Sequence, residues 1–241
     1  MRLDALRGLA VVWMTVFHFC FDLNLHGFLH QRMLADPFWT VQRSVIVSLF
    51  LFCAGIGQGV AIHAGPGWPR FWRRWAQVAG CAALVTLGSW LVFPDTFIGF
   101  GVLHGLAVML VIARLSAGLG RWLWPLGAAA LALPWIAAGL LPGSGLEAAF
   151  NGVPLRVLGL VTVKPFTEDY VPILPWLGVV WWGLAAGGWL ARRRSGLLDG
   201  RLPGRAAAAL AWLGRHSLPW YMLHQPVLMG LVGAVYWLLH R

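Results

Sequence analysis

The stretch ALRGLAVVWMTVFHFCFDL, residues 5–23, decides the fold class. It is mostly apolar over a length close to the ~20 residues that a helix needs to cross the hydrocarbon core of a bilayer. Arg7, His18 and Asp22 stand within it as ionisable residues in a segment that otherwise suits lipid. We therefore predict a membrane-spanning helix here. We also expect its ionisable residues to have a function, because such groups are costly inside a membrane.

Six further apolar stretches of similar length follow along the chain. They cover residues 43–63, 75–93, 101–118, 122–141, 171–191 and 216–239. The composition agrees, since 59% of the 241 residues are hydrophobic and only 11% are charged, whereas soluble domains carry about 25% charged residues. A soluble enzyme, a disordered chain, a collagen-like fibre and a disulfide-rich secreted domain are thereby excluded. We predict an all-α, polytopic transmembrane helical bundle of about seven spans, forming a single domain over residues 1–241.

The segment between residues 142 and 170 contains only a short apolar piece, residues 155–163. It is too short to cross a bilayer alone. A re-entrant segment, an interfacial helix and half of a broken span are all compatible with it.

The charges are distributed unevenly along the chain. Lysine and arginine number 18 against 8 acidic residues, which gives a formal charge of +10. If the N-terminus is cytoplasmic, thirteen of the basic residues fall on the inner side of the predicted spans and five on the outer side. This is the positive-inside pattern of membrane proteins. It predicts a cytoplasmic N-terminus and the lipid bilayer as partner, and it removes the basis for a nucleic-acid partner.

Polar residues of the first span share one helix face. At about 100° per residue, Asp4, Arg7, Thr15, His18 and Asp22 return to one stripe. Arg7 and His18 lie eleven residues apart, an axial distance of roughly 16 Å. Asp22, one turn beyond His18, is suited to orient the imidazole. The plainer interpretation is that Asp4 and Arg7 sit at headgroup level and that His18 bonds a neighbouring helix.

Other polar residues are predicted at the depth of His18. His104 begins the fourth span, and Asp169 lies just before the sixth. We expect both to meet His18 and Asp22 near the outer face. His30, in the first outer loop, is a further candidate for the same cavity.

The last span carries a second polar face. Tyr221, His224 and Gln225 lie on it or beside it, and Arg215 precedes it at the inner side. Ordinary hydrogen bonding between helices is an alternative role for these side chains. No metal site is expected, because the sequence has no HExxH motif and no CxxC motif, and its three cysteines lie in apolar runs.

Glycines four residues apart recur within the predicted spans. The pairs are Gly55/Gly59, Gly101/Gly105 and Gly183/Gly187. Such pairs permit close contact between membrane helices. They also leave room for a homodimer.

Four stretches, in order, resemble the catalytic domain of the heparan-alpha-glucosaminide N-acetyltransferase family of membrane proteins. They are LDALRGLAVVWMTVFHF (3–19), FIGFGVLHGLA (97–107), DYVPILPWLGVVWWGLAAG (169–187) and LGRHSLPWYMLHQPVL (213–228). The spacing of Arg7 and His18 also looks like that of membrane acyltransferases that modify surface glycans. The resemblance implies a multi-pass protein of the bacterial inner membrane that uses acetyl-CoA. The acetyl group would pass to an amine or hydroxyl of a glycan-like or small-molecule acceptor on the outer side.

Roles for individual residues follow from the stripe and the resemblance together. His18 is the expected general base or transient acyl carrier, with Asp22 orienting it, and His104 or Tyr221 polarising the thioester carbonyl. The lysosomal relative instead suggests a functional histidine near His30. Asp169 completes the predicted catalytic group. The predicted CoA-binding group lies toward the inner side and comprises Asp4, Arg7, Arg215, Tyr221 and His224.

Two other functions remain open from the sequence. A proton-coupled transporter or flippase also uses intramembrane histidine and aspartate, although no internal repeat is evident. A membrane subunit that only scaffolds an enzyme would bind no CoA and would tolerate substitution of His18.

Overall fold

Helices form where the apolar stretches lie. The computed structural model describes residues 2–65, 67–193, 196, 200 and 204–240. The all-α class is confirmed for these residues, which contain no strand and one isolated bridge, between Phe100 and Tyr170. Helices satisfy their own backbone hydrogen bonds, which a bilayer requires of a spanning segment.

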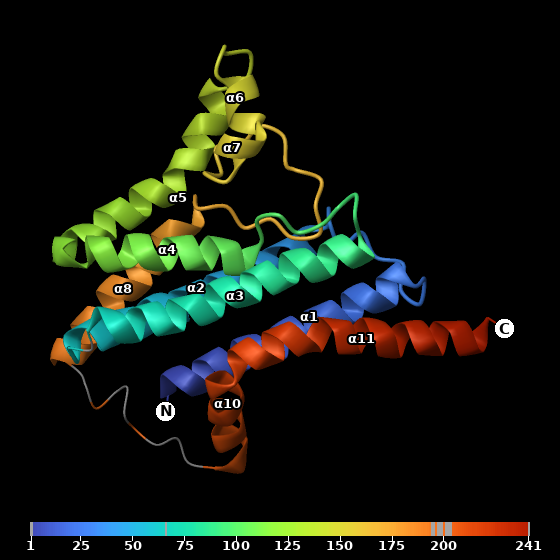
Figure 1. Cartoon of the computed structure of the whole chain (residues 1–241), viewed down its shortest axis with the longest axis horizontal. Coiled ribbons are helices and arrows are strands. Elements are labelled where there is room, and N and C mark those ends of the chain that lie inside the picture. Colours follow the sequence, from blue (N-terminus) through green and yellow to red (C-terminus); the bar gives the residue numbers. More distant parts are fainter. Residues whose placement is uncertain (1, 66, 194–195, 197–199, 201–203, 241) are drawn as a thin grey trace. The chain divides into compact units, whose positions relative to one another are not determined.

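The elements follow the predicted stretches in order (Figure 1). They are α1 (Arg2–Leu25), α2 (Pro37–His63), α3 (Trp68–Val92), α4 (Val102–Ser116), the 3-10 turn η1 (Ala117–Trp122), α5 (Leu123–Leu140), α6 (Glu147–Asn151), α7 (Val153–Arg156), α8 (Trp176–Arg193), α10 (Arg205–Arg215) and α11 (Ser217–Leu239). Each of the seven predicted spans therefore contains a helix, although residues 171–175 of the sixth precede α8.

Five stretches of the described chain are long and apolar enough to cross a membrane: Arg2–Leu25, Pro37–His63, Trp68–Val92, Val102–Leu140 and Ser217–Leu239. The protein is thus a multi-pass membrane protein. The stretch Val102–Leu140 has 39 residues, which is about twice the length that one crossing needs. Gly120 interrupts it with φ 54° and ψ −115°, a backbone conformation that favours glycine. It therefore contains two helices, α4 and α5, where the sequence predicted two spans.

The described residues divide into two compact units. Unit 1 comprises Met1–Phe50 and Gly196–Arg241, and unit 2 comprises Leu51–Ser195. The division falls within α2, so unit 1 holds α1, the first half of α2, α10 and α11. A single acyltransferase-like domain over the whole chain stays a prediction.

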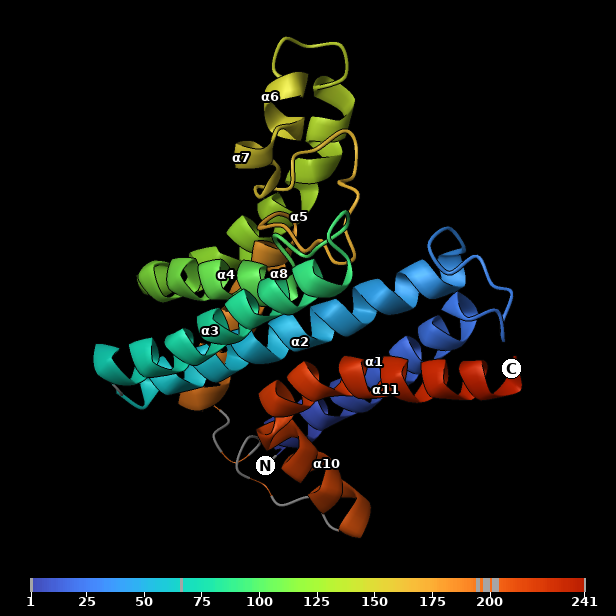
Figure 2. The same cartoon turned by 45° about the vertical axis from the view of Figure 1, so that its right-hand side comes forward.

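In unit 1, α1 and α11 run side by side in the same direction, as Figures 1 and 2 show. Hydrogen bonds pair Thr15 with Trp220 and Asp22 with Gln225, so the residue numbers rise together on both helices. Parallel first and last spans agree with the odd number of crossings that the sequence predicts. Beside this pair, a core of buried side chains is formed by Met14, Phe17, Met33 and Ile46.

The helix α10 crosses the beginning of α1 through two glycines. A Cβ on Gly8 would collide with the carbonyl of Leu210, and a Cβ on Gly214 would collide with the carbonyl of Asp4. Glycine is therefore required at both positions for the two backbones to approach so closely. The crossing fixes α10 against the first two turns of α1.

In unit 2, the second half of α2 packs on α8 through the predicted glycine pairs. A Cβ on Gly55 would meet the backbone of Val180, and one on Gly187 would meet the backbone of Ile56. Gly59 and Gly183 make the same kind of contact with the opposite helix. The prediction of close helix contact is confirmed for these two pairs. Because both faces are occupied within unit 2, they no longer offer a surface for a homodimer.

The third pair has a different partner. A Cβ on Gly101 would collide with the Asp169 carboxylate, and one on Gly105 would approach the carbonyl of Val171. These glycines thus admit the segment that precedes α8 rather than another spanning helix.

The segment between α5 and α8 forms two short helices, α6 and α7, followed by an irregular stretch. Glu147 holds it together, since its carboxylate accepts hydrogen bonds from the Gly143 backbone N–H at 2.7 Å and from the Thr162 hydroxyl at 2.8 Å. These bonds lower the pKa of the Glu147 carboxyl. With α7 only four residues long, half of a broken span is excluded for this segment.

Replacing Gly183 by valine is expected to destabilise unit 2, because its side chain would meet the Phe52 carbonyl and the backbone of α2. Overpacking of this kind costs about 1–3 kcal/mol, which is measured as a lower Tm of the purified protein in detergent. Gly88→Val is the control, since nothing lies within 4 Å of a Cβ there. Equal losses of stability in the two variants would contradict the α2–α8 packing.

Acidification is expected to loosen the segment around Glu147. A carboxyl with a lowered pKa stabilises the fold above its ordinary pKa and loses that contribution as the pH falls through the lowered value. Hydrogen exchange of residues 143–163, corrected for its intrinsic pH dependence, should rise on acidification in the wild type but not in Glu147→Gln. The control is Glu168→Gln, and an unchanged acid response in Glu147→Gln would refute this role.

Candidate functional site

Three hydrogen bonds connect polar side chains of α1 and α11. Trp220 Nε1 donates to the Thr15 hydroxyl at 2.9 Å, and Gln225 Nε2 donates to Asp22 Oδ1 at 2.8 Å. Between them, His18 Nδ1 and His224 Nε2 lie 2.8 Å apart. The predicted stripe on α1 thus faces α11 from Thr15 to Asp22, while Val12 and Val16 on other faces of α1 are exposed.

The hydrogen-bond network assigns the protons of the two histidines. Nδ1 of His224 lies 2.8 Å from the Tyr221 carbonyl and 3.2 Å from that of Trp220. Because a carbonyl oxygen only accepts, this nitrogen carries hydrogen, and Nε2 of neutral His224 is an acceptor. His18 Nδ1 therefore donates to His224. Neutral His18 then has an unprotonated Nε2, the nitrogen that serves as a base or nucleophile.

His224 therefore takes the orienting role that the sequence assigned to Asp22. The prediction that Asp22 bonds His18 is not what the structure shows, since the Asp22 carboxylate accepts from Gln225. The expected contact of His224 with CoA stays a prediction, and in the structure Nε2 of His224 bonds His18. Gln225 has no definite role from the sequence, and Trp220 is not among the candidate residues. Trp220 nevertheless lies four residues before His224, the same spacing that separates His18 from Asp22.

The side chains around the histidine pair are largely apolar or aromatic. The Phe17 ring meets the His18 ring edge-on at 5.8 Å between centroids, and the Tyr221 ring lies 5.8 Å from His224. His224 is buried, and Asp22 is fully buried. In such surroundings hydrogen bonds and charges act more strongly than in water.

Stability alone does not account for these polar groups. Hydrogen bonds between membrane helices contribute about 0.6 kcal/mol on average. Removing a carboxylate from water costs several kcal/mol, and Asp22 is 0% exposed. The hydrogen bonds therefore return less free energy than burial of the carboxylate costs, and this difference favours a functional role for the α1–α11 face.

At the beginning of α1, Arg7 Nη1 and Asp4 Oδ1 form an ion pair at 3.5 Å. The α10 crossing lies here, because Gly214 approaches Asp4. Arg215, the next residue, is exposed at the end of α10. The crossing thus brings the chain at Arg215 next to the first turns of α1.

His104 and Asp169 lie together in unit 2, at the beginning of α4. The Thr86 hydroxyl donates to the Ile98 carbonyl at 2.8 Å, so it accepts from Nε2 of His104 at 2.9 Å. Nδ1 of His104 then accepts from the Gly101 N–H at 3.3 Å, and Asp169 accepts from the Val102 N–H at 2.7 Å. Both side chains satisfy the first N–H groups of a helix, which is a structural role.

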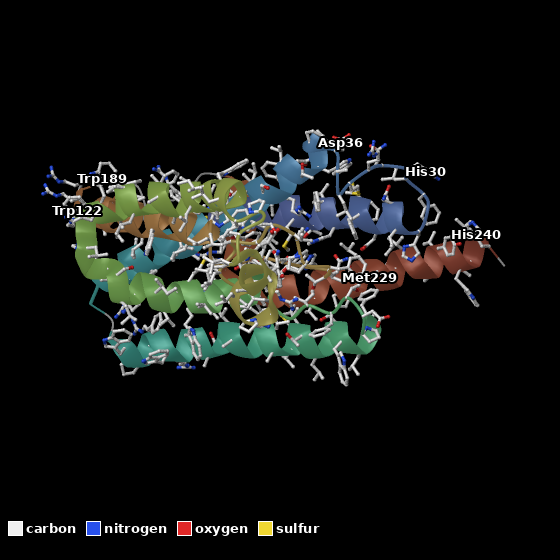
Figure 3. All side chains as sticks on the ribbon, turned by 90° about the horizontal axis from the view of Figure 1, so that it is seen from above. His30, Asp36, Trp122, Trp189, Met229 and His240 are labelled. Carbon is white, nitrogen blue, oxygen red and sulfur yellow. The ribbon has the colours of Figure 1, made fainter. Side chains whose placement is uncertain are left out.

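Neither ring nitrogen of His104 is left for the predicted polarisation of a thioester. His104 and Asp169 belong to unit 2, whereas His18 and Asp22 belong to unit 1. The meeting of the two pairs near the outer face stays a prediction. His30 lies on the connection between α1 and α2, where Figure 3 labels it, and it is exposed.

Comparison with known proteins adds one decisive finding. The family model described as "Heparan-alpha-glucosaminide N-acetyltransferase, catalytic" matches residues 1–226. The chain belongs to this family. Neither a curated protein nor a solved structure matches it.

The match to the N-acetyltransferase family ends at residue 226. It therefore includes α1, α10 and the part of α11 that carries His224 and Gln225. Membership makes the chain a membrane protein of an acetyltransferase family, and acetyl-CoA is the donor that this family uses. The four resembling stretches of sequence had indicated this family.

The tautomers of the two histidines are open to measurement. With ¹⁵N-labelled histidine, NMR at neutral pH should show both His18 and His224 with hydrogen on Nδ1, because each Nδ1 faces an acceptor. In His224→Ala, His18 should lose this preference. Hydrogen on Nε2 of His18 in the wild type would contradict the assignment.

Proposed function

We propose that the protein is a transmembrane acetyltransferase in which His18 is the base. It transfers the acetyl group of cytoplasmic acetyl-CoA to an amine or hydroxyl of a sugar-like acceptor at the outer face. The observation that carries this proposal is the His18–His224 pair, which leaves Nε2 of His18 unprotonated on an intramembrane helix face. Membership of the acetyltransferase family supports the reaction type.

In this proposal, Nε2 of His18 takes the proton of the acceptor's amine or hydroxyl as that atom attacks the thioester carbonyl carbon. The new C–N or C–O bond forms and the C–S bond breaks. The proton on His18 then passes to the departing CoA sulfur, which leaves as the thiol. Transient acetylation of Nε2 of His18 is the two-step version of the same transfer.

His224 would act as a positioning residue. Its Nε2 accepts from Nδ1 of His18 in the resting state and continues to accept when His18 becomes imidazolium. The Tyr221 carbonyl anchors Nδ1 of His224 and so prevents the other tautomer. His104, Asp169 and His30 have no step in this mechanism, because the first two cap α4 and the third is exposed on a connection.

The CoA phosphates would bind at the other end of the same helix. Arg7 and Arg215 supply positive charge where α10 crosses α1, and Asp4 pairs with Arg7. The pantetheine arm would span the roughly 16 Å of helix between Arg7 and His18. Tyr221, whose ring lies 5.8 Å from that of His224, keeps the predicted role of lining this path.

The seven-span arrangement with a cytoplasmic N-terminus belongs to the proposal. Thirteen basic residues on the predicted inner side against five outside support this orientation. Exposed Trp122 and Trp189, at one end of unit 2 in Figure 3, both belong to the predicted inner side. A bacterial inner membrane is the expected location, because a cytoplasmic supply of acetyl-CoA is required.

A proton-coupled transporter or flippase is the second candidate, and it would also use His18 and Asp22. It has less support, since the matched family is named for acetyl transfer. Thermal stabilisation of the purified protein by CoA distinguishes the two, because a transporter of polar solutes has no reason to bind CoA.

His18→Ala is expected to reduce acetyl transfer by roughly 10²–10⁴-fold, the usual contribution of a general base. His224→Ala should reduce it less, because Nε2 of His18 remains but its orientation is lost. Proteoliposomes with labelled acetyl-CoA and a glucosaminide acceptor provide the measurement. His240→Ala, at the end of α11, is the control. Wild-type turnover by a folded His18→Ala protein would refute the proposal.

A further inference from the structure

The pair formed by Asp22 and Gln225 contains two acceptor atoms that no described residue satisfies. Asp22 Oδ2 and Gln225 Oε1 are both buried without a hydrogen-bond partner. Within the pair, Gln225 Nε2 donates to Asp22 Oδ1 at 2.8 Å. Asp22 has no exposed surface. Buried polar atoms are nearly always paired, so two neighbouring exceptions require a reason.

The orientation of the Gln225 amide is fixed by its neighbour. A carboxylate only accepts, so the amide must present its NH₂ group to Asp22 and its oxygen elsewhere. A flipped amide would place two acceptor oxygens against each other. The unpaired oxygen of Gln225 is thus a consequence of the bond to Asp22.

The two histidines that flank Asp22 on α1 donate no hydrogen bond to its Oδ2. His26, one turn beyond Asp22, places Nδ1 2.9 Å from the backbone carbonyl of Asp22. His18, one turn before it, uses Nδ1 on His224. The two histidines that flank Asp22 on α1 therefore leave Oδ2 without a donor.

We propose that Asp22 Oδ2 and Gln225 Oε1 bind a hydrogen-bond-donating group of the acyl acceptor, one helical turn from His18. Two acceptors, one of them a carboxylate oxygen, select an ammonium or hydroxyl group and reject carboxylates and phosphates. Nε2 of His18 is a third acceptor on the same face. This inference rests on the proposed function, and it assigns Asp22 to binding the acceptor rather than to orienting His18.

The site also distinguishes an amine from an alcohol. An ammonium group pairs with the carboxylate as a charged donor and gives one proton to Asp22 Oδ2 before its nitrogen attacks as a neutral amine, whereas a hydroxyl forms an uncharged hydrogen bond. Asp22→Asn preserves the shape of the side chain but removes the charge and adds a donor. It should therefore weaken the binding of an amine more than that of an alcohol.

The test uses the full-length protein in nanodiscs with methyl glucosaminide and methyl glucoside as matched probes. Asp22→Asn should raise KM for the glucosaminide by about tenfold or more, with a smaller change for the glucoside and little change in KM for acetyl-CoA. The exchange variant Asp22→Asn/Gln225→Glu restores one carboxylate and one amide to the pair. It should recover most of the lost affinity for the glucosaminide.

Gln42→Leu is the control, because Gln42 bonds Trp13 between α1 and α2 within the same unit. An unchanged KM for both probes in folded Asp22→Asn, or no recovery in the exchange variant, would overturn the inference.

Stabilisation of His18→Ala by the glucosaminide, measured as a rise in Tm, reports binding without turnover. If wild type and His18→Ala turn over equally, the proposed function fails. If the glucosaminide raises the Tm of His18→Ala but not that of Asp22→Asn/His18→Ala, the binding site at Asp22 is supported even when the proposed function fails.

Discussion

The hydrogen bond between His18 and His224 is the interaction on which the proposed chemistry of this protein depends. It joins the first and last long helices, fixes one proton on each ring and leaves Nε2 of His18 unprotonated in a mostly apolar environment. The bond has this effect because the Tyr221 carbonyl determines the tautomer of His224. A backbone atom of α11 thereby sets the tautomer of a side chain on α1.

Close helix packing provides the frame for this arrangement. Gly8 and Gly214 let α10 cross α1 near Arg7, so the helix that carries His18 is held at its beginning as well as along its length. In unit 2, backbone contacts at Gly55 and Gly187 likewise hold α2 and α8 close together. Small residues thus establish the packing at both crossings.

Much of the fold could be predicted from the sequence, because length and hydropathy define spanning helices directly. The face of α1 that carries His18 also followed from helical periodicity. The partners did not, since periodicity within one helix says nothing about which helix it faces. Asp22 was expected to bond His18 because they are one turn apart, whereas its carboxylate accepts a hydrogen bond from Gln225 of α11. His104 looked catalytic, and only the Thr86 and Gly101 contacts show that it caps α4.

The central claim is that acetyl-CoA lies along α1 with its acyl group at His18. A cryo-electron microscopy structure in lipid nanodiscs, with the thioester sulfur of acetyl-CoA replaced by methylene, tests it most directly. The carbonyl carbon of the analogue should lie near Nε2 of His18, with room for only the acceptor between these two atoms. The phosphates of the analogue should lie beside Arg7 and Arg215. An analogue bound away from α1, or a His18 ring parted from His224, would contradict it.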